Sequence, residues 1–219
     1  MALRAVRKIA EAELPTRWGV FRILGFEGQF PEPRVCGENG ELPDTKTEEI
    51  VALVMGDIHS RPTLVRVHSQ CMTGDVFGSV RCDCRLQLEL ALSKISEEGA
   101  GVLLYEQQEG RGIGIMAKLK AYALQDHGLD TVEANVKLGY AADCREYELP
   151  VEVLKQLGVK QVRLMTNNPG KVAAVEAGGI EVAERVSAEV EPLDTFERYL
   201  RTKHEKMGHI FDHVSQTLG

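Results

Sequence analysis

Hydrophobic positions recur with two different periods along the chain from residue 64 onward. Short runs rich in β-branched residues predict buried strands at 102–105, 161–166 and 180–186. Apolar residues spaced as on one helix face predict helices at 86–98, 113–127, 151–157 and 169–177. Strands that alternate with helices are typical of α/β proteins, so we predict a layered single domain with a mixed β-sheet flanked by helices.

Two segments depart from this pattern. Residues 28–48 are rich in Gly, Pro and acidic residues and show neither period, which predicts a surface loop or an insertion. Residues 195–209 form a polar stretch, for which we predict a helix whose charges make a solvated face. No internal repeat divides the sequence. We therefore expect one domain over residues 1–219, with the pattern weakest over residues 1–50.

Composition narrows the class of protein. The 219 residues are 43% hydrophobic and 27% charged, which suits a folded core. A formal net charge of −7 argues against binding nucleic acid through its phosphates, whereas a small anionic ligand needs only a few local cations. No apolar run reaches the roughly 18 residues that cross a membrane, and the charged first residues do not resemble a secretory signal. We expect a cytoplasmic protein that binds neither nucleic acid nor membrane.

Cysteine usage points to a metal. Of the five cysteines, three lie close together in the sequence, at Cys71, Cys82 and Cys84. An odd number of cysteines in a cytoplasmic protein fits a disulfide framework poorly, so metal binding is the better hypothesis. The remaining two, Cys36 and Cys144, match no pattern and we interpret them as incidental.

The spacing of the clustered thiols suits Zn²⁺. If residues 82–84 are extended, positions i and i+2 point to one face, while Gly74 and Gly78 let the preceding loop fold back. Three protein ligands would leave a fourth position for water, as in catalytic zinc sites. Two alternatives stay open. The thiols can be small buried side chains without a metal, or His68 can complete a closed structural site.

Two glycine-containing junctions between a strand and a helix can bind anions. Residues 109–114, EGRGIG, place backbone amides and Arg111 at a predicted helix N-terminus, although such a segment can also be only a turn. In residues 166–171, TNNPGK, Thr166 can donate to a phosphate oxygen, Asn168 can cap the helix and Lys171 adds a positive charge. Two such junctions favour a triphosphate, because open sheets bind ligands beyond the carboxyl ends of their strands.

Several motifs follow one another in order: RVHSQCMTGD (66–75), RCDC (81–84), EGRGIG (109–114), DTVEAN (130–135) and TNNP (166–169). Their order and spacing resemble the GTP cyclohydrolase II family. The resemblance runs from about residue 64 to residue 211 and includes KMGH (206–209), whereas the first fifty residues match only in patches.

The resemblance implies that the protein hydrolyses GTP in the first committed step of riboflavin biosynthesis. The imidazole ring would be opened and formate and pyrophosphate released, giving 2,5-diamino-6-hydroxy-4-(5-phosphoribosylamino)pyrimidine. One Zn²⁺ per subunit, Mg²⁺ with the triphosphate and a homodimer are implied as well. By position, the family's zinc ligands fall on Cys71, Cys82 and Cys84. Its GTP contacts fall on Arg66, Val67, His68, Ser69, Gln70, Gln87, Glu109, Gly110, Arg111, Thr131, Thr166 and Lys171.

The resemblance also assigns catalytic roles. It places a proton acceptor at Asp143, a proposed nucleophile at Arg145, and at Tyr122 a tyrosine near the ring-opening chemistry. A guanidinium has a pKa above about 12 and holds its protons, so a nucleophilic Arg145 would need Asp143 to take one. The alternative is that Arg145 acts as an electrostatic clamp on the developing phosphate charge. Sequence leaves both roles open.

Three positions depart from the family's usual residues: Gln70 stands where many relatives carry Glu, Arg85 where Gly is common, and Gly170 where a basic residue is usual. None of them is a thiol of the cluster. Three rival functions remain to be separated. One is a relative that opens the ring but keeps the formyl group, the second is a catalytically silent nucleotide-binding or zinc-stabilised module, and the third is a zinc-finger-like nucleic-acid binder. The acidic balance argues against the last.

Overall fold

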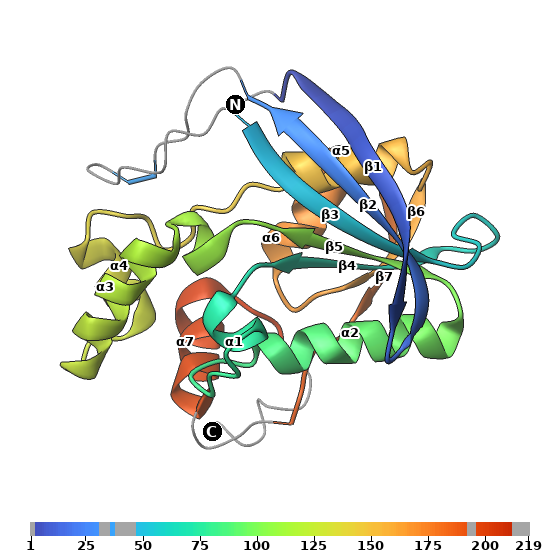
Figure 1. Cartoon of the computed structure of the whole chain (residues 1–219). Helices are drawn as coiled ribbons and strands as arrows, with labels where there is room; N and C mark the ends of the chain where they lie inside the picture. The colour runs from blue at the N-terminus through green and yellow to red at the C-terminus, as the bar shows by residue number, and fades with distance from the viewer. Residues whose placement is uncertain (1–2, 31–35, 38–46, 192–195, 212–219) are drawn as a thin grey trace.

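Seven strands form one mixed sheet in the computed structural model, which describes residues 3–30, 36–37, 47–191 and 196–211 (Figure 1). The strands are β1 (Ala5–Thr16), β2 (Gly19–Gln29), β3 (Thr47–Met55), β4 (Thr63–Ser69), β5 (Gly101–Glu106), β6 (Gln161–Met165) and β7 (Glu181–Val186). Their order across the sheet is β1-β2-β3-β5-β4-β6-β7. Strands β1, β2, β3 and β5 pair antiparallel, and β5, β4, β6 and β7 pair in parallel.

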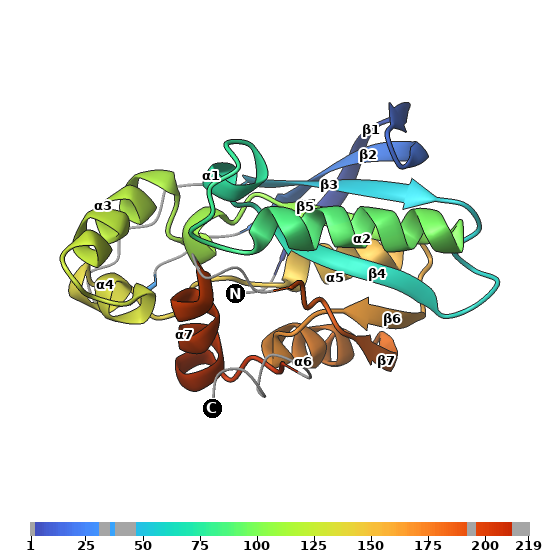
Figure 2. The same cartoon turned by 90° about the horizontal axis from the view of Figure 1, so that it is seen from below.

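Helices cover both faces of the parallel half of the sheet (Figure 2). They are α1 (Met72–Asp75), α2 (Cys84–Glu98), α3 (Ile115–Asp126), α4 (Thr131–Lys137), α5 (Glu148–Gln156), α6 (Pro169–Ala177) and α7 (Glu197–Met207), with a 3₁₀ turn η1 (Glu109–Gly112) before α3. Helix α2 lies across β4 and β5 on one face, while α5 and α6 lie on the opposite face. Helices α3 and α4 project to the side, where α4 contacts α7.

The core follows from this layering. On the α2 face, Ile95 packs with Leu64 and Leu103, and on the other face Leu154 of α5 and Val175 of α6 pack with the strands. Full burial of each such side chain contributes about 1.5–3 kcal/mol. Because both faces are covered, β4 and β5 are buried almost throughout, as expected for parallel strands.

The predicted fold class is confirmed, and the predicted strands and helices after residue 100 are all present within a few residues. The strands before residue 70 and the short helix α4 were not predicted. The predicted loop at 28–48 is wrong at its ends, because residues 28 and 29 belong to β2 and residues 47 and 48 to β3. Residues 31–35 and 38–46 of that segment lie outside the described residues.

The prediction that the charges of the C-terminal helix form a solvated face is wrong at Lys203. Its side chain is buried, and its Nζ lies 2.8 Å from Oδ1 of Asp83, just before α2. Farther along α7, Lys206 pairs with Asp130 and Glu133 and so ties α7 to α4. The helix is therefore fixed to the rest of the molecule by ion pairs as well as by its apolar side chains.

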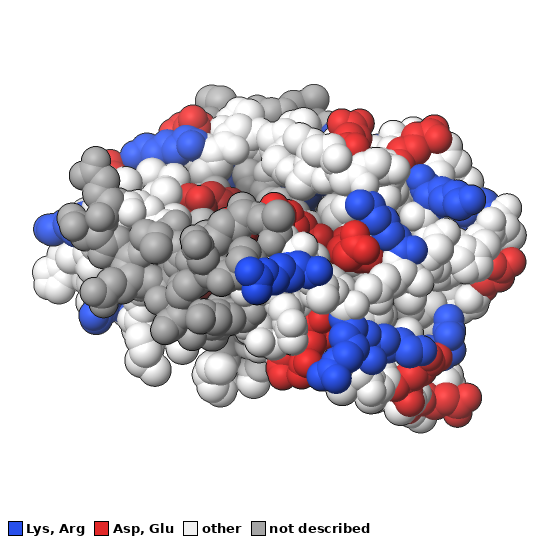
Figure 3. All heavy atoms as spheres, turned by 90° about the horizontal axis from the view of Figure 1, so that it is seen from above, with Lys and Arg blue, Asp and Glu red and all other residues white. Residues whose placement is uncertain are grey.

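The surface charge and the length of the helices complete the description of the fold. Figure 3 shows Lys and Arg side chains interleaved with Asp and Glu on the face viewed from above. Among the described residues, every helix is too short or too polar to cross a bilayer.

Cys36 and Cys144 form a disulfide with their Cα atoms 5.6 Å apart, although they are 108 residues apart in the sequence. The interpretation of these two cysteines as incidental is therefore wrong. Neither lies in a local motif, and only the fold brings them together.

Candidate functional site

The three clustered thiols converge as predicted, but not on a strand. Cys71 precedes α1, Cys82 lies in the turn before α2, and Cys84 is the first residue of α2. Their Sγ atoms all lie within 4.8 Å of one another. Gly74 packs against them, and a Cβ there would lie 3.1 Å from Sγ of Cys82 and 3.2 Å from Sγ of Cys71. The turn into α2, rather than strand alternation, brings Cys82 and Cys84 together.

Asp75 holds this loop in place. One of its carboxylate oxygens accepts hydrogen bonds from the backbone N–H of Cys71 at 2.9 Å and from the Tyr105 hydroxyl at 2.8 Å. The same oxygen lies 3.2 Å from Nε2 of His68. Because His68 is buried against Asp75 and is not part of the thiol group, it does not serve as a fourth ligand.

Lys118 on α3 is a site residue that the sequence reasoning missed. Its Nζ donates to Sγ of Cys71 at 3.1 Å and to Oε1 of Glu109 at 2.6 Å. Burial opposes its charge, but the charge of Cys71 and the hydrogen bond to Glu109 outweigh burial and raise the pKa of Lys118. The other carboxylate oxygen of Glu109 accepts from the backbone N–H of Met72 at 2.6 Å. Glu109 and Lys118 thus join the EGRGIG segment to the thiol loop.

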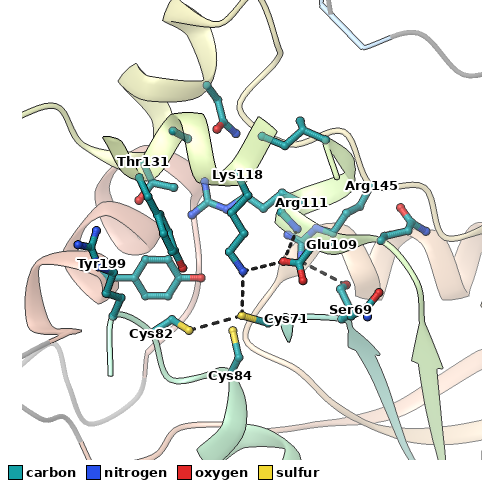
Figure 4. Close-up of a pocket in the computed structure, with 18 of the residues that line it drawn as sticks. Ser69, Cys71, Cys82, Cys84, Glu109, Arg111, Lys118, Thr131, Arg145 and Tyr199 are labelled. Atoms are coloured by element: carbon teal, nitrogen blue, oxygen red, sulfur yellow. Dashed lines mark hydrogen bonds and ion pairs between the residues drawn. The ribbon is translucent and has the colours of Figure 1, made fainter. Parts of the chain in front are cut away.

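The thiols face a cavity (Figure 4). In the close-up the three sulfur atoms point toward one another on one side, and Arg111 and Arg145 lie on another. The residues predicted from sequence that line it are Ser69, Gln70, Cys71, Cys82, Cys84, Glu109, Gly110, Arg111, Tyr122, Thr131 and Arg145. This cavity therefore joins the thiol cluster to the first of the two segments predicted to bind anions.

Arg111 has the features of a group prepared for an anion. It is the one non-glycine residue with a positive φ, 63°, in the described part of the chain. Such a conformation is uncommon and costs free energy that the surrounding structure must offset. Both terminal nitrogens of its guanidinium are buried without a hydrogen-bond partner among the described residues. A buried, unpaired cation is costly, which points to a negatively charged ligand at this place.

Arg145 and Asp143 form a two-pronged ion pair beside this cavity. Nε of Arg145 lies 2.8 Å from one carboxylate oxygen of Asp143, and a terminal nitrogen lies 2.5 Å from the other. Burial opposes ionisation of Asp143, but hydrogen bonds and charge from Arg145 outweigh it and lower the pKa of Asp143. Burial also opposes the charge of Arg145, yet Tyr147 and Asp143 raise its pKa. Both groups are therefore charged.

A second cavity adjoins the first and shares Ser69, Cys84, Arg111, Arg145 and Tyr199 with it. It contains the remaining predicted contacts except Val67, namely Arg66, His68, Gln87, Thr166 and Lys171. The backbone of Val67 reaches the site differently, because its carbonyl oxygen accepts from Nζ of Lys171 at 2.7 Å. The side chain of Val67 lies in the core.

Lys171 is the buried cation at the start of α6. Burial lowers its pKa to about 7, with Glu106 acting in the opposite direction. Asn168 caps α6 as predicted, with its side-chain oxygen 2.9 Å from the backbone N–H of Gly170. His209, from the KMGH segment, lines the same cavity, and its buried Nε2 has no hydrogen-bond partner within the described part of the chain. Lys171 can therefore change charge near neutral pH.

Arg66 and Gln87 contact each other inside the protein. A terminal nitrogen of Arg66 donates to Oε1 of Gln87 at 2.6 Å, and Gln87 in turn donates to Asp83 at 2.6 Å. Asp83 also accepts from Lys203, so the chain of contacts ends on α7. Since Nε of Arg66 has no partner among the described residues, that side chain keeps one donor for a ligand.

Thr131 reaches the cavity because it begins α4. Asp130 caps this helix by accepting from the N–H groups of Val132 and Glu133, and Glu133 bonds back to the N–H of Asp130. The sequence pattern Asp-x-x-Glu at residues 130–133 indicates this capping box and could have predicted α4.

The donor set fits a zinc ion. Three soft sulfur ligands from neighbouring turns converge on one point, and the cavity on their open side leaves room for a further ligand. A mixed α/β fold whose cavity is lined by a thiol cluster and by a buried guanidinium without a hydrogen-bond partner among the described residues defines a candidate metal-dependent enzyme for an anionic substrate.

Comparison with known proteins gives the family. A sequence profile of GTP cyclohydrolase II matches residues 7–187, so the match reaches farther toward the N-terminus than the motifs indicated. GTP cyclohydrolase-2 of Histophilus somni (strain 2336) is 50% identical over 212 residues, which are 96% of this chain and 91% of that protein. The chain belongs to the GTP cyclohydrolase II family and is an enzyme of this type.

Two further comparisons are more partial. The riboflavin biosynthesis protein RibBA of Salinispora tropica is 50% identical over 209 residues, which are 94% of this chain but 48% of that longer protein. A crystal structure of RibBX, a two-domain 3,4-dihydroxy-2-butanone 4-phosphate synthase from A. baumannii, aligns with 74% of this chain and 34% of its own at 17% identity. Its TM-score is 0.35, which is too low to support an inference.

Proposed function

We propose that the protein opens the imidazole ring of GTP by hydrolysis, releases formate and pyrophosphate, and forms 2,5-diamino-6-hydroxy-4-(5-phosphoribosylamino)pyrimidine. One observation carries the proposal: a single cavity has the three thiols on one side and Arg111 and Arg145 on another. Ring opening needs an activated water, and phosphates need cations, which matches this distribution. Family membership supports the reaction, and the name of the Salinispora tropica relative supports a place in riboflavin biosynthesis.

Cys71, Cys82 and Cys84 would hold one Zn²⁺ per subunit. The ion would supply Lewis acidity and activate water beside the purine ring. Around it, Lys118 donates to Cys71 and Gly74 leaves space for the sulfur atoms. Groups of this kind fix the orientation of metal ligands and tune their charge.

Tyr122 would give a proton to the nitrogen that departs during ring opening. Its hydroxyl lies 3.2 Å from Oγ1 of Thr73, which in turn lies 3.6 Å from Sγ of Cys71. Burial raises the pKa of Tyr122, with Thr73 and Lys118 acting in the opposite direction. A tyrosine that keeps its proton near neutral pH can act as a general acid.

Arg145 would act at the α-phosphate as an electrostatic clamp oriented by Asp143. The raised pKa of Arg145 and the lowered pKa of Asp143 support this role over nucleophilic attack. A nucleophilic guanidinium would have to lose a proton to a carboxylate that holds protons weakly. Arg145, held in place by its ion pair with Asp143, can instead keep its positive charge and stabilise the negative charge that develops during pyrophosphate release.

The remaining contacts would divide between the two cavities. Glu109, Gly110, Thr131 and Gln70 line the thiol side, and Thr166 and Lys171 line the second cavity. Gln70 can donate as well as accept, unlike the Glu of many relatives. Mg²⁺ would accompany the triphosphate. A homodimer and a cytoplasmic location belong to the same proposal, and they rest on the resemblance and the sequence.

The decisive experiment measures formate and pyrophosphate together. Protein stripped with a chelator and then reloaded with Zn²⁺ is incubated with GTP and Mg²⁺, and the mass of the pyrimidine product is determined. We expect formate only after reloading, and pyrophosphate both before and after it, because pyrophosphate leaves at the phosphate centre rather than at the ring. A product that retains the formyl carbon would favour the rival ring-opening reaction, and GTP binding without turnover would favour a silent nucleotide-binding module.

A second experiment separates the two centres. Cys82→Ser is expected to lose zinc and formate production while keeping pyrophosphate release, because pyrophosphate leaves at a different reaction centre from the ring carbon. Normal formate production by this variant would contradict a catalytic role for the thiol cluster.

A further inference from the structure

The disulfide between Cys36 and Cys144 lies in the same short segment as the proposed phosphate clamp. Cys144 stands between Asp143 and Arg145 in the sequence. Its backbone N–H donates to the carbonyl oxygen of Arg111 at 3.0 Å. Residues 143–145 therefore carry one half of the disulfide and the two clamp residues. They also donate a backbone hydrogen bond to Arg111, whose guanidinium has no hydrogen-bond partner among the described residues.

Packing around Cys144 leaves little room for independent movement. A Cβ on Gly112 would lie 2.8 Å from the carbonyl oxygen of Cys144 and 3.1 Å from its Cβ. Both cysteines also pack in a small cluster with Ile113 and Ala117. Ile113 lies just before α3, and Ala117 belongs to that helix. A displacement of Cys144 is therefore transmitted to η1 and to the start of α3.

The segment containing Cys36 reaches this place from a distant part of the chain. Figure 1 shows the short piece of residues 36 and 37 beside the part of the molecule that carries α3 and α4. A bond between residues 108 positions apart closes a large loop, which restricts the unfolded chain more than a short loop does. In proteins kept in a reducing compartment, disulfides are usually transient and redox-sensing.

We propose that Cys36 and Cys144 form a reversible thiol–disulfide site whose oxidised state holds the 143–145 segment and the Arg111 turn in the arrangement that binds the nucleotide phosphates. The effect on the nucleotide rests on the proposed function, whereas the redox chemistry of the pair does not.

The chemistry requires an external small-molecule disulfide. The thiolate of one cysteine attacks a sulfur of that oxidant, forms a mixed disulfide and releases one small thiol. The thiolate of the other cysteine then attacks the protein sulfur of the mixed disulfide, and the second small thiol leaves. Both protein thiols lose a proton and together lose two electrons, which reduce the oxidant to two thiols. Excess small thiol reverses both steps.

The first test asks whether the pair forms and reopens. Zinc-loaded protein comprising residues 1–219 is equilibrated with mixtures of glutathione and glutathione disulfide, quenched with acid and alkylated, and its peptides are mapped. We expect a linked pair of Cys36 and Cys144 peptides that disappears as glutathione is increased, with zinc content unchanged. Absence of the linked pair at every ratio, or a pair that glutathione cannot open, overturns the proposal.

The second test asks whether the pair controls the site. The affinity for a non-hydrolysable GTP analogue is measured for oxidised and reduced protein, with Cys36→Ser as the control because Cys36 lies outside the catalytic machinery. We expect oxidised wild type to bind about tenfold more tightly than reduced wild type, and Cys36→Ser to match the reduced form under both conditions. Equal affinities of oxidised and reduced wild type overturn the proposal, as does a redox response in Cys36→Ser.

A third measurement distinguishes failure of this proposal from failure of the proposed function. Thermal unfolding of oxidised wild type is expected several degrees above that of Cys36→Ser, because the closed loop restricts the unfolded chain. If the linked peptides and this shift are found but no nucleotide binds, the proposed function fails and the redox site stands. If formate is produced equally at all glutathione ratios while the pair opens and closes, the control of the site fails and the function stands.

Discussion

Nζ of Lys118 lies 3.1 Å from Sγ of Cys71. The two residues come from α3 and from the loop after β4, and the motif that contains Cys71 includes no lysine. With a divalent zinc ion, three thiolates would leave one negative charge, which the ammonium of Lys118 offsets at hydrogen-bond distance. Lys118 is thus a positioning residue that is expected to tune both the affinity and the charge of the metal site.

Lys118→Met is expected to lower zinc affinity by about 10- to 100-fold, the range typical for lost outer-shell partners of metal ligands. Competition with a chromogenic chelator measures this without any turnover. Lys120→Met, on an exposed position of the same helix, is the matched control and is expected to bind zinc normally. Equal zinc affinity of the two variants would exclude this role of Lys118.

Gly74→Ala is expected to weaken metal binding by crowding the thiols. The added Cβ would meet Sγ of Cys82 at 3.1 Å and Sγ of Cys71 at 3.2 Å, and the sulfur atoms would have to move apart by a few tenths of an ångström. Substituting Co²⁺ and recording the thiolate-to-metal absorption bands reports this displacement directly. Gly25→Ala has no neighbour within 4 Å of its new Cβ and is the control. Unchanged spectra would show that the loop adapts.

Arg145→Lys keeps a positive charge but loses the two-pronged contact with Asp143. If Arg145 is a clamp, pyrophosphate release is expected to fall by about 10²- to 10³-fold, as when one preorganised donor is removed from a transition state. Mass spectrometry of acid-quenched enzyme is expected to find no covalent nucleotide on wild type or variant. An adduct on wild type alone would instead establish nucleophilic attack by Arg145.

Binding of a triphosphate is expected to weaken as pH rises above about 7, because burial lowers the pKa of Lys171 to about that value. Below this pH Lys171 is already charged in the free protein. Above it, the anion must bind a neutral amine or bring a proton with it, so affinity falls by up to tenfold per pH unit until the pKa in the complex is reached.

The test of this pH dependence compares wild type with Lys171→Arg, whose guanidinium stays charged throughout. Dissociation constants of a non-hydrolysable GTP analogue between about pH 6 and pH 9 give two curves, and their difference removes the titration of the phosphates themselves. A slope that is the same in both proteins would contradict a role for Lys171.

Much of the architecture follows from local sequence. Helix α6 begins and ends where predicted, because Asn168 accepts from Gly170 and Pro169 suits the first helical position. Strand β5 was found because it is buried on both faces and reads as a continuous apolar run. Strand β1 was missed because it is largely exposed and carries no clear alternation.

The sequence by itself determined the thiol cluster and the family, and it predicted the two anion-binding segments, because the residues of each motif lie close together along the chain. Tertiary structure alone decided that Lys118 donates a hydrogen bond to Cys71, that Lys203 donates to Asp83, and that Cys36 forms a disulfide with Cys144. These partners are 47, 120 and 108 residues apart. No local pattern encodes such pairs, because the free energy that joins them exists only once the sheet and its helices have packed and water has been excluded between them.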